Sequence, residues 1–249
     1  MKRLWLALVV LVMAAAPARA DVTMTMSISL NAGPIAASGQ NTTFQKGTKV
    51  RIDSKIMKQD QSILIDLDTK QAMMLDNVAK QVRPFDPKQA MAGLPVTFGE
   101  ASASVKPTGQ TKEIMGRVCQ GFAFEVAIPM TMNGETLTVK ASGPAWLAKD
   151  DSVMAQYQAA QKALTDAGLS LSPLGQGPQA KGMAEVAKAL AGAGIVMEQE
   201  IHMTMEGTGQ MAQMMGQMGN IAMTMTVTAI STDPIPDEKF QVPAGYTKK

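Results

Sequence analysis

The sequence predicts an α+β protein in which an antiparallel sheet carries two helices on one face. Short segments with alternating apolar and polar residues dominate the chain, and this period of two is typical of strands with one buried face. Between Asp150 and Gly194 the period changes to about 3.6, which predicts helices. Alternation returns after Gly194, so the helices interrupt a run of strands and gather on one side of the sheet.

The first twenty residues have the three parts of a signal peptide. Lys2 and Arg3 give a basic start, residues 4–16 an apolar core, and Ala18-Arg19-Ala20 an A-x-A cleavage site. We therefore expect a signal peptide over 1–20 and a single mature domain over 21–249, with a helical insertion at about 150–194. Because the residue after the cleavage site is Asp21 and not a cysteine, we expect an unlipidated protein in the bacterial periplasm or secreted.

The composition of the mature chain excludes nucleic acid as a partner and argues against a membrane-spanning segment. Cleavage removes three of the 23 basic side chains, which changes the formal net charge from +2 to −1. With few aromatic residues as well, the mature chain lacks the basic, aromatic surface that nucleic-acid binding requires. No segment beyond the signal peptide approaches the ~20 consecutive apolar residues of a membrane span. The partners expected are a lipid or other apolar ligand, or an envelope protein.

The first half of the mature chain predicts a meander of short antiparallel strands. Residues 22–30 alternate most clearly and predict a strand that ends at the Asn31-Ala32-Gly33-Pro34 turn. The polar residues 36–46 predict a loop or a weak strand. Further strands are expected around Val50 and Ile52, over 63–67 and over 72–76.

The middle of the chain is first irregular and then strongly alternating. Four prolines break up residues 84–107, where we expect no more than a short helix near 88–92. Residues 122–132 predict a long strand, and Asn133-Gly134 is typical of a type I′ hairpin turn. Pro129 lacks a backbone N–H, so it predicts an edge or a bulge in that strand.

The two predicted helices precede two closing strands. Gly168 is expected to end the first helix and Gly194 the second. The closing strands are expected over 195–205 and 221–229, joined by the Gly-rich segment 207–220. The apolar stripes of the helices are formed, in order, by Val153, Tyr157, Ala160, Leu164 and Ala167, and by Met183, Val186, Leu190 and Ala193.

Methionine is the unusual feature of the composition, because 20 of the 22 methionines remain after cleavage. The tripeptide Met-Thr-Met occurs four times, and in a strand both methionines of each copy point to one side. One interpretation is a filled core; the other is a deformable cavity that repacks around apolar ligands. The candidate ligand-binding residues are Met24, Met26, Met130, Met132, Met203, Met205, Met223 and Met225.

A second set of methionines suggests a metal site. Met211, Met214, Met215 and Met218 fall on one stripe if their segment is helical, and His202 is the only histidine. Thioether ligands favour Cu(I), whereas the surrounding glycines weaken a helix and no second histidine or thiolate reinforces the site. The same stripe would also serve as a mobile flap over an apolar cavity.

Catalysis finds no support in the sequence. Cys119 and His202 are the only residues of their types, and no zinc spacing, phosphate loop or nucleophile elbow is present. We therefore expect no enzyme, no catalytic residues and no cofactor. Because Cys119 is alone, no internal disulfide can form.

Several stretches together resemble a family of exported bacterial proteins of unknown function associated with lipoprotein-carrier-like (LolA/LolB-type) folds. The stretches are 49–53 (KVRID), 63–76 (ILIDLDTKQAMMLD), 107–112 (PTGQTK) followed by Ile114, Gly116 and Cys119, 143–150 with Trp146, and 240–246 (FQVPAGY). The resemblance implies a curved antiparallel half-barrel with helices against its concave face, a shape suited to an apolar ligand. It implies no catalytic residues.

The expected function is that of a periplasmic, non-enzymatic protein that binds an apolar ligand or envelope component between sheet and helices. The alternative is a methionine-rich Cu(I)-binding or metal-buffering protein. A third interpretation is a structural envelope protein with a dry core.

Overall fold

A computed structural model describes residues 21–86, 96–132, 134–149, 153, 156, 193–209 and 221–249. The predicted signal peptide and the short helix near 88–92 lie outside these residues. So do Met211, Met214, Met215 and Met218 and, except for Val153 and Ala193, the apolar stripes of the two predicted helices.

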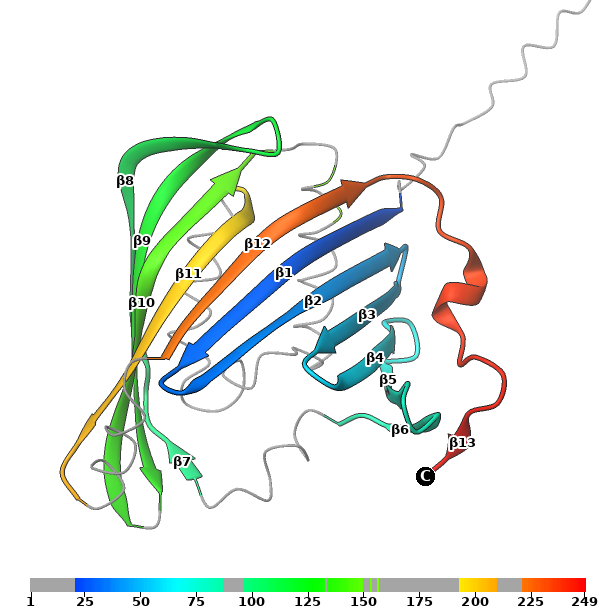
Figure 1. The fold of residues 1–249 in the computed structure, drawn as a ribbon, viewed down its shortest axis with the longest axis horizontal. Coiled ribbons are helices and arrows are strands. Elements are labelled where there is room, and N and C mark those ends of the chain that lie inside the picture. The colour runs from blue at the N-terminus through cyan, green and yellow to red at the C-terminus, as the bar shows by residue number, and fades with distance from the viewer. Residues whose placement is uncertain are drawn as a thin grey trace, which may run out of the picture.

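The described residues form one 13-stranded sheet, shown in Figure 1. Its strand order is β13-β6-β5-β4-β3-β2-β1-β12-β11-β10-β9-β7, and β8 also pairs with β9. Neighbouring strands are antiparallel except for β13, which runs parallel to β6. The first strands are β1 (Val22–Ala32), β2 (Ile35–Lys46), β3 (Lys49–Ile56), β4 (Gln59–Asp66), β5 (Gln71–Asp76) and β6 (Gln81–Pro84). The remainder are β7 (Val96–Phe98), β8 (Ser102–Ile114), β9 (Arg117–Met132), β10 (Glu135–Ala148), β11 (Ile195–Gly207), β12 (Ile221–Ser231) and β13 (Thr247–Lys248).

The predicted fold class, an α+β protein with a curved antiparallel sheet (half-barrel) and two helices on one face, is wrong for the described chain. One large mixed sheet accounts for nearly all of its regular structure, and the described residues contain no helix of seven or more residues. The one helical element bounded among them is the four-residue 3₁₀ helix η2 (Asp237–Phe240). Among these residues, no helix is long and apolar enough to cross a membrane.

The alternating segments are strands, but two local predictions need correction. Residues 36–46 lie within β2, a full strand between β1 and β3, because ladder hydrogen bonds on both sides outweigh its polar composition. Pro129 lies in a strand paired on both sides and not at an edge. The backbone nitrogen of Pro129 faces the gap between the end of β7 and the start of β8, where no strand needs an N–H donor from it. At the same gap the Pro129 carbonyl accepts the Gly99 N–H at 2.7 Å.

The sheet twists strongly from one side to the other. In Figure 1, β8, β9 and β10 stand upright at one side, whereas β1 and β2 run diagonally across the middle. The C-terminal segment, residues 232–249, descends along the opposite side, past β3, and ends beside β6. It packs Val242 and Tyr246 against a buried cluster of Leu64, Leu75 and Val82.

Candidate ligand-binding site

All eight candidate methionines lie on one face of the sheet, which we call the methionine face. Directly opposed residues of neighbouring strands project to the same side of a sheet. Met223 of β12 lies between Leu30 of β1 and Ile201 of β11, which joins three strands into one apolar surface. The surface continues onto β10 and β9 through the opposed residues Met205, Val139 and Ile128. The pairing thus collects four Met-Thr-Met copies from β1, β9, β11 and β12.

The methionines differ in how deeply they lie. Met24 is buried, with 5% of its surface exposed, whereas the other seven candidate methionines are partly exposed. Large fully buried side chains on this face are Leu137 and Val227. The methionine face is therefore closed around Met24 and more accessible along β9, β11 and β12.

One end of the methionine face is covered by the segment that follows β10. Val153 is 1% exposed and belongs to the buried cluster that contains Val22, Met24 and Val227. The Gln45 side chain, also on the methionine face, donates from Nε2 to the Gln156 carbonyl at 3.0 Å. These two contacts place Val153 and Gln156 over the face, so an apolar ligand here would contact more than the sheet alone.

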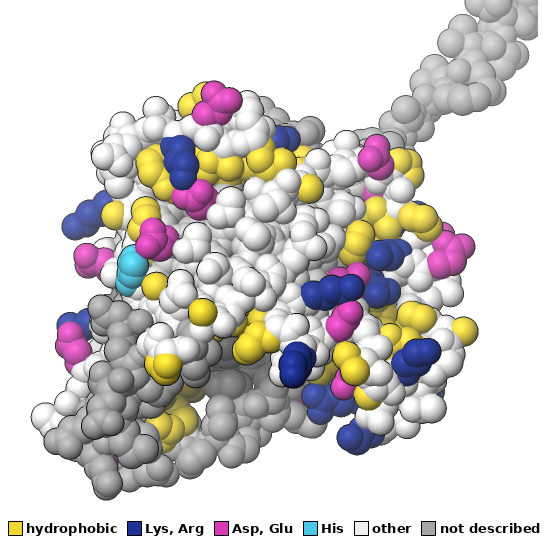
Figure 2. All heavy atoms as spheres, in the orientation of Figure 1, with side chains coloured by type: hydrophobic (Ala, Val, Ile, Leu, Met, Phe, Trp, Pro, Cys, Tyr) yellow, Lys and Arg dark blue, Asp and Glu magenta, His cyan; other side chains and the backbone are white. Residues whose placement is uncertain are grey.

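The opposite face is polar, and we call it the threonine face after the residues that alternate with the methionines. Its rows include Thr25 of β1, Thr42 of β2 and Thr226 of β12. Thr25 and Thr42 share a hydrogen bond of 3.2 Å between their hydroxyl oxygens. Figure 2 shows this face, with few hydrophobic side chains over β1, β2 and β12.

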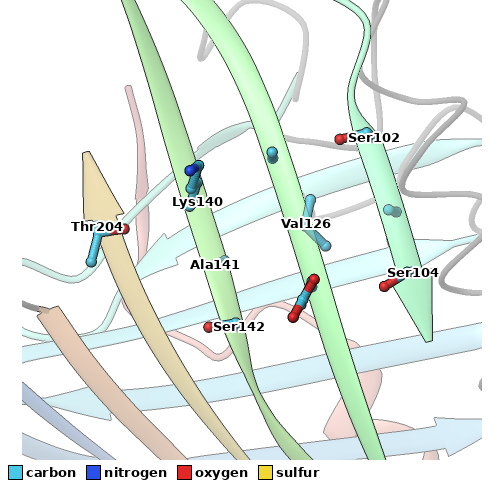
Figure 3. A pocket seen from close by; sticks show the side chains of 10 residues that line it. Ser102, Ser104, Val126, Lys140, Ala141, Ser142 and Thr204 are labelled. Carbon is cyan, nitrogen blue, oxygen red and sulfur yellow. The ribbon is translucent and has the colours of Figure 1, made fainter. Parts of the chain in front are cut away.

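A shallow polar hollow lies on the threonine face where β8, β9, β10 and β11 run side by side. Its volume is about 480 Å³, and Figure 3 shows side chains from four neighbouring strands around it. Lys140 lines the hollow and forms a 2.7 Å ion pair with Glu206. The polar side chains that line it are Ser102, Ser104, Glu125, Lys140, Ser142 and Thr204. None was a candidate from the sequence, although all fall on the polar parity of their strands.

Of the residues of the suggested metal site, His202 alone belongs to the part of the chain that the structure describes; Met211, Met214, Met215 and Met218 lie outside it. His202 lies on the threonine face, because it is opposed to Ser142, whereas the adjacent Met203 lies on the methionine face. Its Nε2 lies 2.9 Å from Oε1 of Glu200, and both side chains are nearly half exposed. Among the described residues, no three His, Cys, Asp or Glu side chains are placed to hold a metal ion.

Cys119 is a buried side chain of the core and does not meet His202. It is fully buried in the same cluster as Val153, and desolvation by that burial raises the pKa of its thiol. The raised pKa leaves less thiolate at neutral pH and so a weaker nucleophile. Cys119 aligns through Ala148 with Ile195, so His202 lies about 20 Å farther along β11.

No protein-family model and no curated protein matches the chain. Similar solved structures include PNGF-II, with a TM-score of 0.33 and 10% identity over 91% of this chain; the chain spans 30% of the length of that protein. A putative outer membrane lipoprotein-sorting protein domain from Vibrio parahaemolyticus has a TM-score of 0.31 and 6% identity over 90% of each chain. A DUF1329 family protein from Desulfovibrio piger has a TM-score of 0.31 and 8% identity over 89% of each chain.

The second of these neighbours is a putative lipoprotein-sorting protein domain, and the sequence resemblance is likewise to lipoprotein-carrier-like proteins. A TM-score near 0.3 is too low to establish a shared fold, and none of these likenesses assigns a ligand or an activity to this chain.

Proposed function

We propose that the protein is a periplasmic, non-enzymatic protein that binds an apolar ligand, such as a lipid acyl chain, or an apolar part of an envelope component, against its methionine face. The observation that supports this most is that eight methionines from four strands share one face while seven of them stay partly exposed. A core that only needed filling would bury them.

Methionine suits such a surface for a physical reason. Its unbranched side chain has three rotatable bonds and a polarisable sulfur, so a surface of methionines repacks around ligands of different shape. Each Å² of apolar surface that an acyl chain removes from water contributes roughly 25 cal/mol, so partly exposed methionines provide binding free energy without directional bonds. The sheet itself supplies a rigid frame, because ladder hydrogen bonds hold each strand from β1 to β12.

The first test uses protein purified from the periplasm of its own host. Native mass spectrometry and metal analysis of that protein should show a co-purifying lipid or other apolar molecule and no stoichiometric copper. The measured intact mass should equal that of a chain that begins at Asp21, because export requires cleavage after Ala20. Protein that carries no apolar molecule and binds no fluorescent fatty acid would refute the proposal.

The second test asks whether the methionine face is the site. Met223→Asp places a charge on that face, whereas Thr224→Asp places the same charge one residue away on the threonine face. We expect Met223→Asp to weaken fluorescent fatty-acid binding by about tenfold or more, because the ligand would desolvate a carboxylate, and Thr224→Asp to leave binding unchanged. Circular dichroism would confirm that both variants are folded. Equal effects of the two variants would place the site elsewhere.

A third variant tests the copper alternative. Replacing Met211, Met214, Met215 and Met218 together by Leu keeps an apolar stripe and removes the sulfur ligands. Fatty-acid binding should therefore survive. If the parent binds Cu(I) stoichiometrically and this variant does not, the metal function replaces the one proposed.

A further inference from the structure

Two strongly exposed apolar side chains project from one end of the sheet. Met57, in the β3–β4 turn, is 68% exposed, and Val78, in the β5–β6 turn, is 71% exposed. The turns are neighbours, because the Asn77 N–H donates to the Asp60 carbonyl at 2.9 Å. With strands about 4.8 Å apart, the tips of the two hairpins lie roughly 10 Å from each other.

The conformation of Met57 does not explain why a methionine is there. Its φ is 54°, in the left-handed region that favours glycine, and it is the first residue of a two-residue hairpin turn. The side chain is too exposed to contribute to the core. Neither turn geometry nor packing therefore accounts for an apolar side chain at this tip.

The turn over 76–81 is built in the same way as the turn over 66–71. In each, Oδ1 of the first residue, an aspartate, accepts backbone N–H groups two and three residues later at 2.8–3.0 Å. In each, the fifth residue is a lysine with a left-handed φ of 51° to 54°. The tip of the first turn is Asp68-Thr69, and that of the second is Val78-Ala79. This hairpin geometry therefore does not require an apolar tip.

Lysines surround the two apolar tips. Lys58 and Lys80 belong to the same two turns and are exposed, and Lys248 of β13 lies beside Val82 of β6. The nearby Asp60 already accepts a hydrogen bond from Asn77 and pairs with Lys55 at 3.3 Å. Figure 2 shows Lys and Arg side chains beside hydrophobic ones over this part of the molecule. Apolar tips with adjacent cations match the interface of a bilayer with anionic headgroups.

We propose that this end of the sheet docks on an anionic membrane surface. Met57 and Val78 enter the boundary between headgroups and acyl chains, and Lys58, Lys80 and Lys248 lie against lipid phosphates. Docking here is separate from ligand binding on the methionine face and does not depend on it.

The test is cosedimentation of the full mature chain with vesicles. The protein should bind vesicles of phosphatidylethanolamine and phosphatidylglycerol, bind vesicles of phosphatidylcholine alone far more weakly, and lose binding as salt is raised. A parent protein that does not bind the anionic vesicles overturns the proposal.

The variant Met57→Gly with Val78→Asp and Ala79→Thr removes both apolar tips and keeps both turns. Glycine suits the left-handed φ at position 57, and Asp-Thr is the tip that the 66–71 turn already has. We expect binding to anionic vesicles to fall by about tenfold or more, since two apolar side chains no longer enter the bilayer and the new carboxylate is repelled by lipid phosphates.

A matched control lies in the β8–β9 hairpin. Met115 is 43% exposed with a φ of 53°, and Val118 is 70% exposed. Met115→Gly with Val118→Asp makes the same change in charge and should leave vesicle binding unchanged. If the control loses as much binding as the first variant, or the first variant binds like the parent, the proposal is overturned. Both variants should bind fluorescent fatty acid like the parent, so failure of docking and failure of the methionine-face site are distinguishable.

Discussion

The two faces of the sheet are made by the same strands and have opposite chemistry. In β1, Met24, Met26 and Ile28 project to the methionine face, whereas Thr25 and Ser27 project to the threonine face. The first face is apolar and partly covered, and the second is polar where it crosses β1, β2 and β12. An antiparallel sheet needs cover on one face only, so the apolar surface that runs from β1 through β12, β11 and β10 to β9, with seven partly exposed methionines, is the feature that favours a ligand. On β2 the same face is polar, with Asn41, Thr43 and Gln45.

The contrast changes toward β6. There the threonine-face side of the sheet carries Leu64, Leu75 and Val82, which are buried beneath Val242 and Tyr246 of the C-terminal segment. The other face at this end is apolar as well, with the buried Val50, Ile65 and Ala72. Near β6, therefore, both faces of the sheet are apolar, and on the threonine-face side the C-terminal segment covers the apolar residues.

The largest expected effect tests the closed part of the methionine face. Met24→Asp should lower the free energy of unfolding by at least about 3 kcal/mol, because it buries an unpaired carboxylate among apolar side chains. Ser29→Asp, in the same strand on the exposed threonine face, should change it by less than about 0.5 kcal/mol. Urea unfolding of the two variants measures the difference. Similar losses would mean that the faces are not distinct in β1.

A smaller effect is expected where the methionine face is more open. Met203 is partly exposed, so Met203→Asp should cost about 2 kcal/mol, less than the change at Met24. His202→Gln changes the next residue on the opposite face and should cost less than about 0.5 kcal/mol. Thermal and urea unfolding of the two variants would measure both losses of stability. A loss at Met203 as small as that at His202 would show that its side chain is solvated.

Much of this arrangement follows from alternation. Because successive side chains in a strand point to opposite sides, residues 22–30 already indicate which face Met24 shares with Met26. The sequence of one strand does not show which strands lie beside it. β1 pairs with β12, which is far away in the chain, and only the pairing register reveals this. The polar residues of β2 carry no apolar pattern, so their strand is set by the partners on each side.

Other features left no signal in the sequence, or left one that was misleading because two residues are neighbours in the chain. β13 pairs in parallel with β6, and its two residues are too few to show an alternating pattern. The polar hollow forms between four strands, from residues that each look like ordinary polar positions. His202 and Met203 are adjacent in sequence, yet strand geometry places them on opposite faces. The predicted fold class is wrong for the described residues because segments without a clear apolar pattern, such as β2, also form strands, so that one sheet accounts for nearly all of their regular structure.

The covered end of the threonine face predicts a moderate effect. The Tyr246 hydroxyl donates to Oδ1 of Asn77 at 2.7 Å, and Nδ2 of Asn77 donates to Oγ of the fully buried Ser62 at 3.0 Å. Tyr246→Phe keeps the ring over Leu75 and removes the hydrogen bond, so it should cost about 1 kcal/mol. Urea unfolding would measure this loss. An unchanged free energy of unfolding would mean that the Tyr246 hydrogen bond contributes nothing to holding the C-terminal segment, which the β13–β6 pairing and the apolar contacts also hold.

The smallest expected effect is a pH dependence of the same C-terminal segment. Lys46 donates to Oδ1 of Asp237 at 2.9 Å; this hydrogen bond holds the pKa of Asp237 below its ordinary value of 3.8 and the pKa of Lys46 above its ordinary value of 10.5. A carboxyl with a lowered folded-state pKa stabilises above its unfolded pKa and loses that contribution as the pH falls through the folded value. A lysine with a raised folded-state pKa stabilises below its unfolded pKa and loses that contribution as the pH rises through the folded value. The melting temperature of the parent should therefore exceed that of Asp237→Asn by a small amount near neutral pH, and the difference should shrink below about pH 4 and above about pH 10.5. Added salt should shrink it as well, since both side chains are exposed. A difference that stays constant from acid to alkaline pH would show that the charges of Lys46 and Asp237 do not interact in solution.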